Sequence, residues 1–113
     1  MSDKVYTIEE IKNMSREMFS RRDFIEKAYL FGSYARNTAD KNSDIDIVVS
    51  LNSPVGMKLY SLYDEIESVF GKNSDILTEN EILNIMPKTY ERDRVLLYER
   101  WGKIVSCPYV WVY

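Results

Sequence analysis

The sequence contains no histidine and only one cysteine, Cys107, among its 113 residues. The absence of histidine excludes zinc sites of the Cys/His type, serine or cysteine hydrolase triads, and any acid–base step that uses an imidazole. A single cysteine also excludes an internal disulfide. Any chemistry must therefore depend on carboxylates, hydroxyls and amines.

Positive charge and long apolar runs are scarce as well. Fifteen Lys and Arg residues stand against 18 Asp and Glu residues, which gives a net charge of −3 and a pI near 5.0. Such a balance provides no diffuse positive field for a long nucleic acid or an anionic lipid surface. No segment approaches the ~18 apolar residues of a membrane span, and the first residues are charged rather than signal-like. We therefore expect a soluble, cytoplasmic protein with no membrane or long nucleic-acid partner.

The composition, with 45% hydrophobic residues, four glycines and three prolines, is typical of one compact domain. We expect this domain to span residues 1–100 and to be followed by an apolar tail, residues 101–113. The role of the tail is open: its alternating apolar residues fit an edge strand, a patch completed by another chain, a sticky tail that is partly disordered, or ordinary packing against the domain. Cys107 lies in this tail and is interpreted as an inert thiol.

Two capping boxes and two apolar stripes predict the helices. Thr7 with Glu10 begins a helix over 7–19, and Thr78 with Glu81 begins a short helix that Pro87 ends. A longer helix is expected over 54–70, opened by Pro54 and stopped by Gly71. Its core-facing stripe is Val55, Leu59, Leu62, Ile66 and Val69, and that of the first helix is Ile8, Ile11, Met14 or Ser15, and Met18.

Short β-branched or apolar runs predict the strands at residues 26–31, 44–51 and 74–77, with 95–98 either a last strand or the end of a helix. The connection between the second and third strands is about two dozen residues long and contains a helix, as a parallel crossover requires. The fold class is therefore α+β with α/β-like character: a small mixed sheet flanked by helices.

This topology predicts that Asp44, Asp46 and Asp75 lie near one end of the sheet. If the first strand is antiparallel to the second, its exit at Gly32 and Ser33 reaches the same end. Asp44 and Asp46 are two apart on a strand and face the same way, so their oxygens can share divalent ions. Hard oxygen donors without His or Cys favour Mg²⁺ or Mn²⁺. A calcium loop of the EF-hand type is rejected because Ile45 stands where that loop needs glycine.

A phosphate-binding role suits the turn beside these carboxylates. Gly32 lets a backbone amide approach a phosphate, and the Ser33 hydroxyl adds a donor. Asp75 is either a third metal ligand or the acceptor of a hydroxyl proton. Arg36 is either a phosphate contact or a solvated loop cation. Lys41 and Lys72 are interpreted as surface charges, and Tyr60 and Tyr63 as packing or partner-surface residues.

The motif Gly32-Ser33, ten residues, then Asp44-Ile45-Asp46 resembles the signature of the polymerase-beta-like nucleotidyltransferase superfamily. The wider segments Gly32–Arg36 and Ser43–Val49 are most similar to its minimal nucleotidyltransferase (MNT) branch. The resemblance implies that Gly32 and Ser33 contact the triphosphate, that Asp44 and Asp46 hold the metals, and that Asp75 is the third carboxylate. It extends closely over residues 28–77 and does not extend to residues 101–113.

Many minimal nucleotidyltransferases are antitoxins of HEPN/MNT toxin–antitoxin pairs, and some transfer AMP from ATP to a tyrosine of the HEPN-type toxin. The resemblance therefore implies ATP or another NTP, Mg²⁺, and a protein hydroxyl as acceptor. A second hypothesis is a non-catalytic antitoxin that neutralises its partner by binding, and a third is a small-molecule transferase. Self-association into an oligomer also stays open.

Overall fold

A four-stranded mixed sheet forms the centre of the computed structural model, which describes residues 3–100. The strand order is β3-β2-β1-β4. β1 (Ile25–Phe31) runs antiparallel to β2 (Ile45–Leu51) and to β4 (Val95–Glu99), whereas β3 (Ser74–Thr78) runs parallel to β2. The structure thus confirms the α+β class, the antiparallel first pair and the parallel crossover, and it makes the segment at 95–99 a strand.

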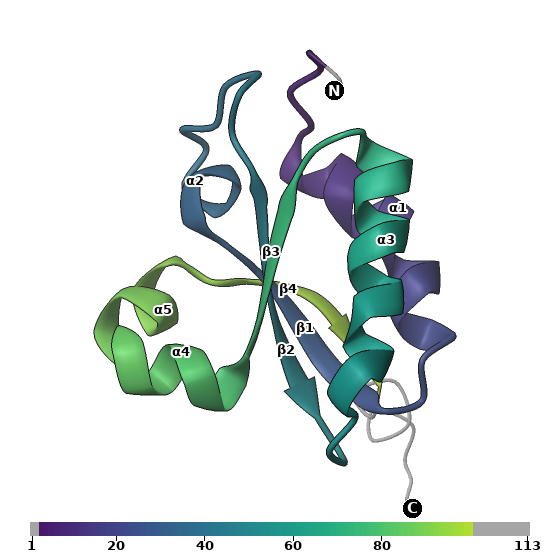
Figure 1. Cartoon of the computed structure of the whole chain (residues 1–113). Coiled ribbons are helices and arrows are strands. Elements are labelled where there is room, and N and C mark those ends of the chain that lie inside the picture. The colour runs from purple at the N-terminus through teal and green to yellow at the C-terminus, as the bar shows by residue number, and fades with distance from the viewer. Residues whose placement is uncertain (1–2, 101–113) are drawn as a thin grey trace, which may run out of the picture.

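Helices cover both faces of the sheet (Figure 1). α1 (Ile8–Ser20) and α3 (Leu59–Phe70) lie on one face, and the short η1 turn (Gly56–Lys58) leads into α3. α2 (Gly32–Ala35), α4 (Glu79–Ile85) and α5 (Pro87–Asp93) lie on the other. Within residues 3–100, no helix is long and apolar enough to cross a membrane. The predicted tail, residues 101–113, lies outside the described residues, so the division at residue 100 stays a prediction.

Both capping boxes are formed. The side chains of Thr7 and Thr78 accept hydrogen bonds from the backbone amides of Glu10 and Glu81, whose carboxylates bond back to the two cap amides. Gly71 ends α3 in the left-handed conformation, with φ 68°. These local signals fixed three helix boundaries because each satisfies backbone groups that the helix leaves unpaired.

The expected helix over 54–70 begins later, at Leu59. Gly56, the first residue of η1, adopts φ 54°, a left-handed conformation that does not fit the interior of an α-helix, and it lies between Pro54 and α3. The buried stripe also ends differently: Phe70 is buried and Val69 is 42% exposed. Leu62, Ile66 and Phe70 form one row at spacing four, so the larger aromatic residue takes the core position.

The structure also decides between Met14 and Ser15 in α1 and adds a helix that the sequence did not predict. In α1 Ser15 is buried and Met14 is exposed, and the Ser15 hydroxyl is satisfied by donating to the Ile11 carbonyl at 2.6 Å. Pro87 follows the end of α4 as expected, but it also begins α5, which the sequence reading missed. Proline suits this first helical position because the amide it lacks would have no partner there.

The main core lies between the sheet and the α1/α3 layer. It contains the inward residues of β2, namely Ile45, Ile47 and Val49, packed with the buried residues of both helices. A smaller cluster of Val48, Ile82 and Tyr90 lies on the opposite face, under α4 and α5. The sheet is therefore covered on both sides near its middle, and its polar residues are confined to its ends.

α3 also binds the outer edge of β3. The Tyr63 hydroxyl donates to the Ile76 carbonyl and accepts from the Ile76 amide, both at 3.0 Å. One turn further on, the Glu67 carboxylate accepts from the Ser74 amide at 3.2 Å. Four helical residues rise about 6 Å and two strand residues about 6.6 Å, so the two side chains match alternate residues of the strand. The crossover helix thus holds the strand that it delivers.

We expect Tyr63→Phe to lower the free energy of unfolding by about 1–3 kcal/mol, because both polar groups of Ile76 lose their partner in a partly buried place. Urea unfolding followed by circular dichroism measures the change. Tyr60→Phe is the matched control: this tyrosine is on the same helix but 62% exposed, and its loss should cost less than about 0.5 kcal/mol. Equal effects of the two substitutions would contradict the assignment.

Candidate active site

The first residues of β2 and β3 bring two of the predicted carboxylates together. Asp46 is the register partner of Asp75 on the neighbouring parallel strand, and the Ile45 amide donates to the Asn73 carbonyl at 3.0 Å. Paired residues on adjacent strands face the same side of a sheet, and adjacent strands lie about 4.8 Å apart. Asp44 and Asp75 are exposed, and Asp46 is partly buried. The predicted placement of these three residues at one end of the sheet is confirmed.

Gly32 lies directly against the Asp46 side chain. Phe31, the last residue of β1, is the register partner of Asp46, and the chain turns at Gly32 with φ 73°. A Cβ atom placed on Gly32 would lie 2.1 Å from Oδ2 of Asp46. The position therefore needs glycine twice, for its backbone conformation and for the space that the carboxylate occupies.

Negative charge is concentrated around Asp46. Burial, together with the charges of Asp75 and Asp44, raises the pKa of Asp46 to about 6, while Arg36 acts in the opposite direction. Burial and the two neighbouring negative charges thus disfavour the ionised form of Asp46. A cation bound among them would relieve this repulsion.

Arg36 directly follows α2, and its partly exposed side chain forms an ion pair. Its guanidinium lies 3.6 Å from the Asp93 carboxylate at the end of α5, and its side chain is 45% exposed. Its charge also reaches Asp46. Neither interpretation of Arg36 included this ion pair with Asp93, and its contact with a phosphate stays a prediction.

Ser33 is partly exposed within α2, the single turn that begins at Gly32. Its carbonyl accepts from the Thr38 amide at 2.9 Å, which folds the following loop back onto the turn. Further along, the Asp40 carboxylate accepts from the Asn42 amide at 2.8 Å, and the Asp40 amide donates to the Ser43 hydroxyl at 2.9 Å. The small polar residues of this loop therefore bond to one another and lead the chain back to Asp44.

Lys72 corrects a sequence interpretation. It was expected to be a surface charge, but its side chain is only 2% exposed, and its ammonium group donates to the Lys41 carbonyl at 3.0 Å. No pattern in the sequence around Lys72 predicts that its side chain is buried. The contact depends on the loop before β2 lying beside the turn before β3, which only the tertiary fold provides.

The chemistry of the donors suits a hard divalent cation, because the three carboxylates offer oxygen atoms alone. Within residues 3–100, however, no three Asp, Glu, His or Cys side chains are already arranged to hold a metal ion. Phosphate and water oxygens would have to complete any coordination shell. This fits ions such as Mg²⁺, which keep several waters and bind through one or two carboxylates and substrate phosphates.

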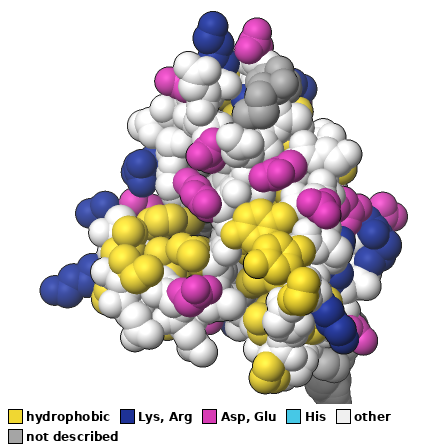
Figure 2. All heavy atoms as spheres, in the orientation of Figure 1, with side chains coloured by type: hydrophobic (Ala, Val, Ile, Leu, Met, Phe, Trp, Pro, Cys, Tyr) yellow, Lys and Arg dark blue, Asp and Glu magenta, His cyan; other side chains and the backbone are white. Residues whose placement is uncertain are grey.

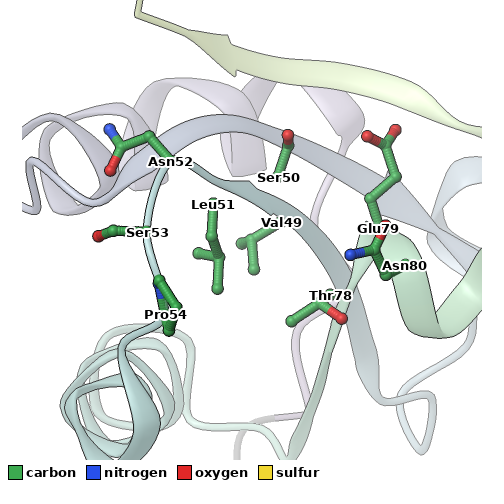
Figure 3. A pocket seen from close by; sticks show the side chains of 9 residues that line it. All are labelled: Val49, Ser50, Leu51, Asn52, Ser53, Pro54, Thr78, Glu79 and Asn80. Atoms are coloured by element: carbon green, nitrogen blue, oxygen red, sulfur yellow. The ribbon is translucent and has the colours of Figure 1, made fainter.

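A cavity of about 390 Å³ lies at the other end of β2 and β3 (Figure 3). It is lined by the carboxyl ends of these strands, the segment that follows β2 and the beginning of α4, including Ser50, Asn52, Pro54 and Thr78. None of the predicted site residues lines it.

On the face of the molecule that Figure 2 shows, acidic side chains lie above two hydrophobic areas.

Comparison with known proteins shows which family the chain belongs to. The nucleotidyltransferase domain family matches residues 8–101. A putative protein adenylyltransferase of Methanocaldococcus jannaschii is 40% identical over 73 residues, which cover 64% of this chain and 73% of that protein.

Two solved structures are similar in fold. The crystal structure of a toxin–antitoxin with AMP-PNP gives a TM-score of 0.66 at 21% identity, over 81% of this chain and 76% of the other. A tri-AMPylated Shewanella oneidensis HEPN toxin in complex with its MNT antitoxin gives a TM-score of 0.56 at 17% identity, over the same shares. The sheet order, the carboxylates at one end and the family match agree, and the chain belongs to the nucleotidyltransferase domain family.

Proposed function

We propose that this protein is a protein adenylyltransferase that transfers AMP from ATP to the hydroxyl group of a tyrosine on a HEPN-type toxin. In this way it acts as the antitoxin of that toxin. The observation that carries the proposal is the position of Asp46 between Asp75 and Gly32. The reaction class is supported by the relative named as an adenylyltransferase, and the partner by the fold neighbour that contains an AMPylated HEPN toxin.

In this proposal Gly32 and Ser33 bind the triphosphate of ATP, with Arg36 as a further contact. The Gly32 amide can approach a phosphate because no side chain intervenes, and the exposed part of the Arg36 side chain can turn toward an anion. Nucleotidyltransferases generally use divalent metal ions. Asp44 and Asp46 would hold Mg²⁺ or Mn²⁺, with Asp75 as a third ligand or as the group that receives the hydroxyl proton.

The transfer itself forms one bond and breaks one. The acceptor oxygen attacks the α-phosphorus, the bond from that phosphorus to the bridging oxygen breaks, pyrophosphate leaves, and the hydroxyl proton passes to a carboxylate or to solvent. Bound divalent ions would neutralise the triphosphate and the charge that develops on pyrophosphate. The exposed positions of Asp44 and Asp75 leave the site open to an acceptor carried by another protein in the cytoplasm.

We expect Asp44→Asn and Asp46→Asn each to lower AMP transfer by at least about a hundredfold, because each removes a charged oxygen donor from the proposed metal site. The assay incubates the protein with α-³²P-labelled ATP, Mg²⁺ and the folded product of the adjacent gene, and measures label on that partner. Asp64→Asn, an exposed residue of α3, is the control and should retain full activity.

The same variants separate catalysis from binding. Wild-type protein that transfers no label to the folded partner would refute the adenylyltransferase proposal. Neutralisation of the toxin that survives both substitutions would favour the second candidate function, an antitoxin that acts by binding alone.

Gly32→Ala and Gly56→Ala test the role of the close contact with Asp46. Both glycines have positive φ, so both substitutions strain the backbone by about 1–2 kcal/mol. A Cβ on Gly32 would displace the Asp46 carboxylate, whereas nothing lies within 4 Å of one on Gly56. We expect Gly32→Ala to lose AMP transfer by about a hundredfold or more and Gly56→Ala to retain it, at similar losses of stability. Full activity of Gly32→Ala would contradict the assignment.

Asp46→Asn should stabilise the metal-free protein at pH 8. The folded-state pKa of Asp46 is about 6, above its ordinary value of 3.8, so the folded protein binds this proton more tightly than the unfolded chain does. Its contribution to stability is therefore full below pH 4 and is lost as the pH rises through 6, a difference of up to about 3 kcal/mol.

We expect the substitution to raise the unfolding midpoint in EDTA at pH 8 and to have little effect at pH 4, as measured by thermal unfolding at both pH values. Asp64→Asn should change neither midpoint appreciably. A loss of stability at pH 8 would show that Asp46 is not held at a cost.

A further inference from the structure

Lys72 is a buried cation that the proposed chemistry does not use. It lies in the turn between α3 and β3, after the helix-ending Gly71 and before Asn73. Its side chain is 2% exposed, and its Nζ atom donates to the Lys41 carbonyl, 31 residues away in sequence, at 3.0 Å. Burying an ammonium group costs free energy unless it is hydrogen-bonded, so a residue that served packing alone would be better apolar.

The contact joins two segments of the proposed site, the loop that leads to Asp44 and the turn that leads to Asp75. Lys41 stands three residues before Asp44, and Lys72 stands three residues before Asp75. The hydrogen bond from the Ile45 amide to the Asn73 carbonyl links the same two segments one step closer to the carboxylates. Bonds among its own residues and to Ser33 also hold the loop that contains Lys41, and Ala39 of this loop packs against the main core. The Lys72 ammonium therefore connects this loop to the β3 side of the site.

We propose that Lys72 is a positioning residue of the nucleotidyl-transfer site: it holds the Lys41 carbonyl and thereby fixes the segment that carries Asp44 relative to the segment that carries Asp75. This inference rests on the proposed function, because it assigns Lys72 a purpose in holding carboxylates for a metal–nucleotide complex. Lysine suits the task because its long stem can cross between two backbone segments while its ammonium group donates to a carbonyl oxygen.

The test compares the full-length protein with Lys72→Met and Lys72→Arg. Met has a similar length without the donor, and Arg restores a donor. Isothermal titration calorimetry measures binding of α,β-methylene-ATP, which cannot release pyrophosphate by the normal cleavage, as a function of Mg²⁺ concentration. We expect Lys72→Met to raise the Mg²⁺ concentration at half-saturation about tenfold, the smaller end of the effect of losing a partner that orients metal ligands. Lys72→Arg should recover most of this loss.

Tyr63→Phe is the control for stability alone. It weakens the outer edge of β3 without touching the contact to Lys41, so it should lower the unfolding midpoint and leave the Mg²⁺ dependence unchanged. The proposal is overturned if Lys72→Met half-saturates at the wild-type Mg²⁺ concentration, or if Tyr63→Phe shifts that concentration as much as Lys72→Met does.

Amide hydrogen exchange separates this inference from the proposed function, since it needs no nucleotide. In the metal-free protein, Lys72→Met should accelerate exchange of the Ile45 amide at least tenfold relative to Tyr63→Phe, because the segments before Asp44 and Asp75 are then less firmly joined. Wild-type protein that binds no nucleotide analogue would refute the proposed function, while unchanged exchange at Ile45 would refute the structural role of Lys72.

Discussion

The parallel pairing of β2 with β3 is the constraint on which the site depends. It makes Asp46 and Asp75 register partners although 29 positions separate them in sequence. A parallel pair requires a crossover, and α3 supplies it while burying Leu62, Ile66 and Phe70 against the sheet. Because the crossover helix also bonds to the edge of β3 through Tyr63, the element that makes the parallel pairing possible also stabilises it.

The site is locally unfavourable to the fold that carries it. Asp46 is partly buried beside two other carboxylates, and Gly32 adopts a left-handed backbone conformation directly against it. Neither feature improves packing, since an apolar residue at position 46 would suit a half-buried strand better. The apolar core under Ile45, Ile47 and Val49 lies on the opposite face and keeps the strand in place despite this repulsion. A concentration of such costs at one end of a sheet is typical of a functional site.

Features encoded within a few residues could be predicted from the sequence. The capping boxes at Thr7 and Thr78, the stop at Gly71 and the alternation of β2 all depend on local groups, and the length of the crossover then placed the carboxylates. Features decided by distant contacts could not be predicted. Burial of Lys72 depends on the Lys41 carbonyl, and the Arg36 ion pair depends on Asp93 in a helix that the sequence reading missed.

The open position of the carboxylates bears on where acceptor specificity comes from. Asp44 and Asp75 are exposed, and the pocket of about 390 Å³ lies at the other end of β2 and β3, away from these carboxylates. Recognition of a protein acceptor needs no such pocket, because docking can hold a tyrosine beside the α-phosphate and exclude water at the same time. The exposed position of the carboxylates is therefore the feature of the site that suits the protein acceptor of the proposed function.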